Sequence, residues 1–286
     1  MGQKNEDEDE GRDPALKAAV LGWPVSHSLS PKLHNYWIKH HNIDGIYTTM
    51  AVMPEHLPAA FDILRERGFK GCNLTIPLKE AALPLITDHD ESCLMSGAVN
   101  TVVFQGDVIR GFNSDGFGFM EGLKMQKPDW DGTRVVVVGT GGASRGIIAS
   151  LKAEGAKHFV LINRTVEKAE RVVKQFKLNA EIVEWKHRAD ALKDATMLIN
   201  CSSLGMDNHP KLDLPLTDLP ETATVCDIVY RPQKTPLLKD ARMRGNPVVQ
   251  GLPMLLHQGR LGFEYWFGTD PEITKGLYKM MIDAIN

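Results

Sequence analysis

Short apolar runs recur through the second half of the chain, and a stretch with helical spacing separates most of them from the next. The runs occupy residues 135–138, 159–162, 180–183, 197–200 and 224–228. The first run is four consecutive valines, which is typical of a strand buried on both faces of a parallel sheet. Strands that alternate with helices in this way predict a parallel, doubly wound α/β fold for this half.

The first half of the chain predicts a second α/β unit with more varied strands. The expected strands are 15–22, 47–52 and 70–76, followed by a hairpin whose arms are 99–104 and 108–112. Ser30, as a hydroxyl N-cap, and Pro31, at the first helical position, predict the start of a helix. Further helices are expected over about 54–68 and 117–125, and from residue 251 toward the C-terminus.

Three glycines follow the valine run directly. Gly139, Gly141 and Gly142 are succeeded by a helix-compatible run at 147–152. A strand, a glycine turn and a helix in this order let the backbone approach a pyrophosphate, whose charge lies at the helix N-terminus. The match to G-x-G-x-x-G is imperfect, because Ser144 occupies the sixth position. The competing interpretation is a tight turn that binds no ligand.

The next expected strand ends in residues that bear on the choice of nucleotide. Asn163, Arg164 and Thr165 follow it, and Lys168 lies one helical turn further on. An acidic residue here would bind the ribose 2′-hydroxyl of NAD, whereas an arginine accommodates the 2′-phosphate of NADP. A guanidinium can hold a phosphate through two hydrogen bonds. The sequence therefore predicts NADP, against the alternative that Arg164 is a solvated residue at a strand end.

Other polar residues lie where further expected strands end. Ser28 and Ser30 stand beside a helix start, where they either cap the helix or hold a small carboxylate. Lys79 follows an X-Pro bend and would be catalytic only if a pocket surrounds it. The loops at 200–206 and 227–230 are candidates for the nicotinamide end, because ligands bind at the carboxyl ends of strands in open α/β sheets.

Composition narrows the function classes. The chain has 286 residues, which suggests two domains or one large one, and 43% of them are hydrophobic. The net charge of −3 gives no reason to expect a nucleic-acid partner. No apolar stretch approaches the ~18 residues of a membrane span, so no membrane partner is expected either. The polar, mostly acidic start of the chain is unlike a signal peptide, and a disordered acidic tail is expected over residues 1–14.

The cysteines and histidines suggest neither a disulfide framework nor a metal site. The four cysteines include no C-x-x-C pair, and the ten histidines show no H-E-x-x-H spacing. This pattern fits reduced, buried thiols in a cytoplasmic protein. We therefore expect no bound metal.

Nine separated motifs, in order along the chain, resemble those of the shikimate dehydrogenase family over about residues 15–286. They are SHSLSP at 26–31, NLTIPLK at 73–79, GAVNT at 97–101, NSDG at 113–116, GTGGASR at 139–145, NRT at 163–165, NCSSLGM at 200–206, DIVY at 227–230 and the segment 251–258. A single match of this kind would mean little, whereas nine in register are highly specific.

The resemblance implies an activity and an architecture. The activity is the NADPH-dependent, reversible reduction of 3-dehydroshikimate to shikimate, in chorismate and aromatic amino acid biosynthesis. The fold would be α/β with two domains: an N-terminal α/β substrate domain, 15–115 plus 252–286, and a Rossmann-like, doubly wound NADP domain, 116–251. The active site would lie in the cleft between them. The expected partner is the small-molecule substrate, and the expected assembly is a monomer or a homodimer.

The resemblance also implies residue roles, motif by motif. Lys79 and Asp115 would be the catalytic pair. The expected substrate-binding residues are Ser28, Ser30, Thr75, Lys79, Asn100, Asp115, Tyr230 and Gln258. The expected cofactor-binding residues are Gly139, Gly141, Gly142, Ala143, Asn163, Arg164, Thr165, Lys168, Ser202, Ile228 and Gly251. Lys79 suits proton donation to a developing alkoxide and Asp115 suits its orientation, but a coupled pair shares its titration, so the main proton carrier stays open.

Some positions depart from the common family pattern, and other functions compete. The departures are Ser114, Cys201, Ser202, Gln250 and Pro253, which bear on fine specificity rather than on reaction class. The closest alternative is a quinate/shikimate dehydrogenase with broader cofactor use, although Arg164 argues against NAD. A non-catalytic nucleotide-binding module would be expected to lack Lys79 or Asp115. Methylenetetrahydrofolate dehydrogenase and glutamyl-tRNA reductase, which have similar NADP domains, would be expected to lack the motif at 26–31.

Overall fold

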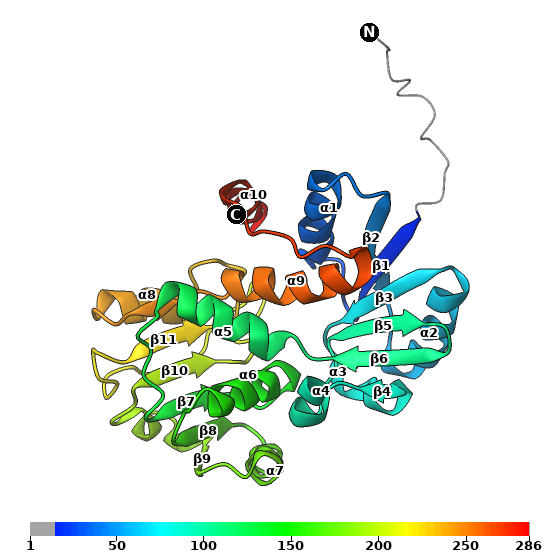
Figure 1. Cartoon of the computed structure of the whole chain (residues 1–286). Helices are drawn as coiled ribbons and strands as arrows, with labels where there is room; N and C mark the ends of the chain where they lie inside the picture. The colour runs from blue at the N-terminus through cyan, green and yellow to red at the C-terminus, as the bar shows by residue number, and fades with distance from the viewer. Residues whose placement is uncertain (1–14, 286) are drawn as a thin grey trace.

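Two six-stranded sheets, each with apolar clusters on both faces, make up the structure (Figure 1). It is a computed structural model and describes residues 15–285. The acidic tail expected over residues 1–14 lies outside the described residues. The predicted fold class, α/β with a second, doubly wound sheet, is confirmed. No helix within residues 15–285 is both long and apolar enough to cross a membrane.

The first sheet is mixed. Its strands are β1 (Leu16–Gly22), β2 (Gly45–Ala51), β3 (Phe69–Leu74), β4 (Asp88–His89), β5 (Thr101–Gln105) and β6 (Val108–Phe112), in the order β2-β1-β3-β5-β6-β4. β1 pairs in parallel with β2 and β3, whereas the hairpin β5–β6 joins β3 in the antiparallel sense. The sequence pattern does not predict β4, because two residues are too few to carry a periodic signal.

The second sheet is parallel throughout. Its strands are β7 (Val135–Val138), β8 (Phe159–Asn163), β9 (Ala180–Glu184), β10 (Met197–Asn200), β11 (Thr224–Asp227) and β12 (Val248–Val249), in the order β12-β11-β10-β7-β8-β9. Numbered along the chain and read from β9, this is the order 3-2-1-4-5-6 of dinucleotide-binding folds. The order reverses between β7 and β10, so a ligand crevice is expected at their carboxyl ends. The short β12 is the one strand of this sheet that the hydrophobic pattern of the sequence does not predict.

The α-helices connect and cover these strands. They are α1 (Ser30–His40), α2 (Leu57–Glu66), α3 (Leu78–Ala81), α4 (Glu91–Ser96), α5 (Asp115–Gln126), α6 (Gly142–Ala153), α7 (Val166–Phe176), α8 (Pro236–Met243), α9 (Leu252–Phe267) and α10 (Lys275–Ile285). Short 3₁₀ turns occur at Pro54–His56, Leu83–Leu85, Trp185–His187 and Asp190–Leu192. The predicted helices agree in place, with boundaries that differ by a few residues.

The prediction that Ser30 caps α1 is wrong. Leu29 occupies the N-cap position, and Ser30 already lies in the first helical turn together with Pro31. The Ser28 hydroxyl accepts a hydrogen bond from the Ser30 N–H at 3.3 Å. The Ser30 hydroxyl is therefore not used to cap the helix.

The valine run of β7 packs on both faces, as its composition predicts. Val135 and Val137 belong to one apolar cluster, which includes side chains of α5, α6 and α7. Val136 and Val138 belong to the cluster on the opposite face, which includes side chains of α8. Burial of alternate residues on both faces excludes water from the whole strand and leaves only its end loop for ligand contacts.

Helices α5 and α9 lie side by side between the two sheets (Figure 1). Two glycines of α5 allow the close approach: a Cβ on Gly118 would lie 2.6 Å from the Met254 carbonyl oxygen, and one on Gly122 would lie 3.0 Å from the Met254 nitrogen. Met254 packs in the core of the second sheet and the adjacent Leu255 packs in the core of the first. The pair of helices therefore ties the two cores together.

Candidate active site

Polar side chains gather at the edge of the first sheet where β1 and β3 end. Because these strands are parallel, the loops that follow them start at the same edge. The segment after β1 carries Ser28, in the loop, and Ser30, at the start of α1, and the segment after β3 carries Thr75 and Lys79. The strand β5 runs antiparallel to β3 and so begins at this edge, which brings Asn100 there as well.

Lys79 and Asp115 form an ion pair at this edge. Lys79 Nζ lies 2.6 Å from Asp115 Oδ2, and their side chains are only 15% and 2% exposed. Lys79 lies on α3, directly after β3, and Asp115 is the first residue of α5, where the helix dipole favours a carboxylate. Lys79 is therefore not a solvated surface residue.

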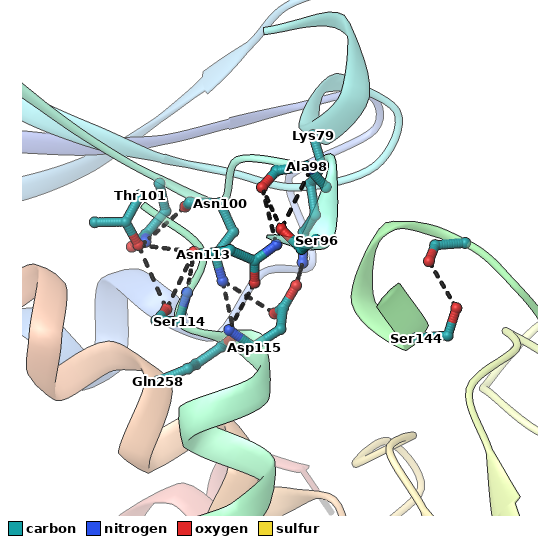
Figure 2. A network of polar contacts seen from close by, with 12 residues as sticks. Lys79, Ser96, Ala98, Asn100, Thr101, Asn113, Ser114, Asp115, Ser144 and Gln258 are labelled. Carbon is teal, nitrogen blue, oxygen red and sulfur yellow. Dashed lines mark hydrogen bonds and ion pairs between the residues drawn. The ribbon is translucent and has the colours of Figure 1, made fainter. Parts of the chain in front are cut away.

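Asn100 holds the other oxygen of this carboxylate (Figure 2). Its amide donates to Asp115 Oδ1 at 3.0 Å and, at a longer 3.5 Å, to Gln258 Oε1. The side-chain oxygen Oδ1 of Asn100 accepts from the Ser114 N–H and from the Thr101 hydroxyl, both at 2.9 Å. Because Asn100 is 3% exposed and has partners on both polar atoms, the orientation of Asp115 is fixed.

A second asparagine, Asn113, holds the backbone of Asp115 (Figure 2). Its Oδ1 accepts from the Asp115 N–H at 3.0 Å, and its amide donates to the Ala98 carbonyl at 3.0 Å. The hydroxyl of Ser96 donates to the same carbonyl at 2.9 Å. One short segment, 96–100, therefore supports Asp115 through both its side chain and its main chain.

The serines expected to hold a carboxylate lie beside a buried tyrosine. The hydroxyl of Tyr47 donates to Asn73 Oδ1 at 2.6 Å, and the Ser30 side chain is close enough to work against the rise in the pKa of Tyr47. Asn73 in turn donates to the Thr101 hydroxyl at 3.2 Å. Burial raises the pKa of Tyr47 well above its usual value, so the hydroxyl stays protonated. A continuous series of hydrogen bonds thus joins Tyr47 to the network around Asn100.

Tyr230, which follows the second sheet's strand β11, lies beside the segment that contains Ser28 and Ser30. It follows β11 and packs against the core of the first sheet. Burial raises the pKa of Tyr230, and a hydrogen bond with the Leu29 backbone opposes that rise. Leu29 lies between Ser28 and Ser30, so the loop after β11 meets the loop after β1.

The glycine loop between β7 and α6 lies at the reversal of strand order. Gly139 has a φ of +94°, and a Cβ there would lie 3.3 Å from the backbone nitrogen of Ser202 in the loop after β10. A Cβ on Gly142 would lie 3.3 Å from Lys79 Cβ, whereas Gly141 faces open space. No side chain caps α6, so its first N–H groups and the space beside Gly141 fit a pyrophosphate.

The carboxyl end of β8 carries exposed cations. Arg164 and Lys168 are exposed and make no ion pair with another described residue. Asn163 donates to the Thr165 carbonyl at 2.7 Å, and Thr165 is the N-cap residue of α7 without a hydrogen bond from its own side chain to that helix. Two free cations beside an available hydroxyl fit a phosphate monoester.

Ser202, Ile228 and Gly251 lie together at the crevice. The N–H and the hydroxyl of Ser202 both donate to Asn200 Oδ1, at 3.0 and 2.7 Å. The Ile228 N–H donates to the Asn200 carbonyl at 3.1 Å. A Cβ on Gly251 would lie 2.5 Å from the Ile228 carbonyl oxygen, so only glycine fits at this start of α9. These three of the predicted cofactor residues therefore lie close together, although they come from three separate segments.

The cysteines near the crevice are thiols. All four cysteines are free, as the sequence predicts. Burial raises the pKa of Cys201 and of Cys226 above the usual value, so both thiols remain protonated. Within the part of the chain that the structure describes, no group of His, Cys, Asp and Glu side chains could hold a metal ion.

Models of known protein families match three successive parts of the chain. Residues 20–102 match the shikimate dehydrogenase substrate binding domain, residues 121–206 match shikimate/quinate 5-dehydrogenase, and residues 251–275 match the shikimate 5′-dehydrogenase C-terminal domain. The shikimate dehydrogenase (NADP(+)) of Paramagnetospirillum magneticum is 44% identical over 266 residues, which cover 92% of this chain and 96% of that protein. The chain belongs to the shikimate dehydrogenase family.

Solved structures of this family superpose closely on the chain. Shikimate 5-dehydrogenase from Thermus thermophilus, in complex with NADP(H) and shikimate, has a TM-score of 0.83 at 35% identity and covers 94% of this chain and 99% of that one. Quinate dehydrogenase from Corynebacterium glutamicum, in complex with NAD, has a TM-score of 0.83 at 25% identity with the same coverage. The fold is thus shared by proteins named for different substrates and cofactors, and individual side chains must decide between them.

Several residues that hold the site are not among those predicted for this family member. Asn113 stands in a quoted motif, so the sequence offers a signal for it, but the motif does not show that it supports Asp115. Tyr47 and Asn73 come together only when β2 and β3 pair through β1, and their spacing gives no sign of this. Motifs therefore include some of the supporting residues, but the contacts that those residues make depend on strand pairing.

Proposed function

We propose that the chain is an NADP-dependent shikimate dehydrogenase, which catalyses the reversible reduction of 3-dehydroshikimate to shikimate in chorismate biosynthesis. The observation that carries this proposal is the buried Lys79–Asp115 ion pair beside the glycine turn, where a Cβ on Gly142 would lie only 3.3 Å from Lys79 Cβ. A proton donor and a bound nicotinamide could then reach the same carbonyl group. We assign residues 15–115 and 252–286 to a substrate domain and residues 116–251 to an NADP domain.

NADP(H) fits the crevice of the second sheet. Gly139, Gly141, Gly142 and Ala143 would surround the pyrophosphate, at the uncapped start of α6. The nicotinamide would lie beside Ser202, Ile228 and Gly251. The names of the curated relatives and the NADP(H) complex from Thermus thermophilus support this cofactor. The cofactor supplies the hydride, and the protein supplies position and electrostatics.

The 2′-phosphate would be held at the end of β8. Arg164 would hold it through two hydrogen bonds, with Asn163, Thr165 and Lys168 beside it. Both cations are exposed and unpaired among the described residues, so neither must leave another partner on binding. NAD lacks this phosphate, and the position offers no carboxylate for its 2′-hydroxyl.

The substrate would lie across the edge of the first sheet. Ser28 and Ser30 would hold its carboxylate, because both hydroxyls lie at the N-terminal end of α1. The ring hydroxyls would be bound by Thr75, Asn100, Asp115, Tyr230 and Gln258. The structure of a relative with shikimate bound supports a substrate of this class.

Proton transfer would be the task of the buried pair. As the carbonyl carbon gains the hydride, its oxygen takes a proton from the Lys79 ammonium and becomes a hydroxyl. The lysine is left as a neutral amine and recovers a proton from solvent. In the oxidative direction the amine accepts the hydroxyl proton. Asp115, fixed by Asn100 and Asn113, orients Lys79 and stabilises its charged form.

A comparison of four assays tests the proposal. The purified protein is given shikimate or quinate, each with NADP⁺ or NAD⁺, and the reduced nicotinamide is followed by its near-ultraviolet absorbance. We expect reduction largely confined to shikimate with NADP⁺. Comparable rates with quinate or NAD⁺ would indicate the broader quinate/shikimate dehydrogenase, to which the complex from Corynebacterium glutamicum gives weight. No rate in any assay would overturn the enzymatic assignment. The free cysteines suit a reducing compartment such as the cytoplasm.

A further inference from the structure

A second asparagine–aspartate pair lies where β10 and β11 end. The parallel register places Asn200 beside Asp227, and the Asn200 amide donates to Asp227 Oδ1 at 3.0 Å. Both residues are buried, with Asp227 2% exposed. The roles proposed above use Ser202 and Ile228, from the loops that follow these strands, but neither member of the pair itself.

Asp227 accepts three hydrogen bonds and forms no ion pair with a described residue. Oδ1 accepts from the Asn200 amide and from the Val229 N–H, each at 3.0 Å, and Oδ2 accepts from the Thr235 hydroxyl at 2.7 Å. Thr235 is also the N-cap of α8, where its hydroxyl accepts from the Leu238 N–H at 3.3 Å. The carboxylate therefore fixes the whole loop between β11 and α8.

Asn200 fixes the neighbouring loop in the same way. Its Oδ1 accepts both donors of Ser202, and its amide also donates to the Leu204 carbonyl at 3.0 Å. The Leu204 N–H donates to the Ser202 hydroxyl at 3.2 Å, which closes the loop. The contact between Asn200 and Asp227 thus joins two loops that are each organised around one of its members.

We propose that Asp227 is a positioning residue for the nicotinamide half of the cofactor, because it joins the two loops that carry Ser202 and Ile228. This inference rests on the proposed function. All three of its partners donate, so both carboxylate oxygens of Asp227 must act as acceptors. The simpler account is that Asp227 only stabilises the second sheet. The two accounts differ in what happens to the two halves of the cofactor when the carboxylate is removed.

The variant Asp227→Asn keeps the shape of the side chain and turns one acceptor into a donor. We expect the dissociation constant for NADP⁺, measured by titration calorimetry, to rise on the order of tenfold. Adenosine 2′,5′-bisphosphate carries the adenosine half and the 2′-phosphate but no nicotinamide. Its dissociation constant should change by less than about twofold, since the end of β8 is not altered. Equal weakening of both ligands, or of neither, would overturn the proposal.

Asn246 offers a matched control at the opposite end of β11. It is 4% exposed, and its amide donates to the carbonyl oxygens of Pro220, Glu221 and Ala223 at 2.8, 3.1 and 3.0 Å. Asn246→Ala should lower the melting temperature about as much as Asp227→Asn does. It should leave the dissociation constant for NADP⁺ within about twofold of wild type. A loss of NADP⁺ affinity in this variant as well would assign the effect to general stability.

Variants of Thr235 keep the proposal testable if Asp227→Asn does not fold. Thr235→Val removes the hydroxyl and should weaken NADP⁺ binding selectively, whereas Thr235→Ser keeps the hydroxyl and should restore binding. Equal affinities in the two variants would contradict the role given to Asp227. These are binding measurements, so a wild-type protein that binds NADP⁺ but oxidises no shikimate would refute the proposed function and leave this inference in place.

Discussion

Two buried asparagine–aspartate pairs lie at strand ends, one in each half of the molecule, and they differ most clearly in the partner of the second carboxylate oxygen. In both pairs the amide donates to Oδ1 at 3.0 Å, from Asn100 to Asp115 in one and from Asn200 to Asp227 in the other. Oδ2 of Asp115 contacts the ammonium group of Lys79 at 2.6 Å. Oδ2 of Asp227 contacts a neutral threonine hydroxyl at 2.7 Å.

Under the roles proposed above, the partner of Oδ2 distinguishes the carboxylate that takes part in proton transfer from the one that positions the cofactor loops. A carboxylate beside an ammonium group belongs to a pair that can gain and lose a proton at the substrate. The carboxylate of Asp227 has only neutral donors around it, and its hydrogen bonds hold two loops in place. The fixed asparagine–aspartate contact thus occurs twice in the fold, and the proposed proton transfer needs the lysine that contacts only one of the two carboxylates.

The largest expected effect comes from removal of that lysine. Lys79→Met keeps much of the side-chain volume and removes the ammonium group. The turnover number should fall by about 10²- to 10⁴-fold, as is typical for loss of a general acid or base. The dissociation constant for NADP⁺ should stay near that of wild type. Steady-state kinetics and calorimetry check both expectations, and retention of more than about a tenth of the turnover number would exclude proton transfer by Lys79.

The second prediction concerns the contribution of Asp227 to the pH dependence of stability. Burial raises the pKa of Asp227 from 3.8 to about 7, and its three hydrogen bonds oppose the rise. The titratable groups beside it are the thiols of Cys201 and Cys226, which stay protonated. Between these two pKa values the folded state holds a proton that the unfolded state releases. The contribution of Asp227 to the free energy of unfolding therefore falls as pH rises through this window, by at most about 4 kcal/mol.

The variant Asp227→Asn should lack this fall, because it carries no titrating group at the position. Urea unfolding at about pH 5 and about pH 8 measures the difference for both proteins, with Asn246→Ala as a control that should keep the wild-type dependence. The ionised form is the one that accepts all three hydrogen bonds, and the folded protein ionises only at the upper end of this window. Wild type should therefore gain NADP⁺ affinity as pH rises through about 7. The same slope in Asp227→Asn and in wild type would contradict the assignment.

The sequence predicts the second sheet better than the supports of the site. Four consecutive valines and a glycine turn suffice to predict β7 and the crevice, because their signal is local. The pairing of Asn200 with Asp227 depends instead on the parallel register of β10 and β11, which no local spacing encodes. The error at Ser30 concerns a helix boundary, because the helix starts one residue earlier than a capping serine would require. Motif resemblance predicted Lys79 and Asp115, but only the fold shows that they touch.

The third prediction sets the two asparagines against each other. Asn100→Ala removes the amide that orients Asp115, so the Michaelis constant for shikimate and the turnover number should both worsen by roughly tenfold or more. Asn200→Ala removes the corresponding amide from Asp227, so the NADP⁺ dissociation constant should rise by a similar factor. Each variant is the control for the other. Equal damage to substrate and cofactor parameters by both variants would mean that the two supports do not act separately.

The smallest expected effect lies at the end of β8, outside both pairs. Arg164→Ala should raise the Michaelis constant for NADP⁺ by about tenfold, since a charge-assisted hydrogen bond contributes about 1.5–3 kcal/mol before solvent screening at this exposed position. The Michaelis constant for NAD⁺ should change little, because NAD⁺ has no 2′-phosphate. Arg171→Ala removes an equal charge from an exposed position further along α7 and should leave both constants near wild type. If Arg164→Ala instead weakened NADP⁺ and NAD⁺ equally, the end of β8 would not distinguish the cofactors, and their choice would have to come from the nicotinamide-side loops that Asn200 and Asp227 hold.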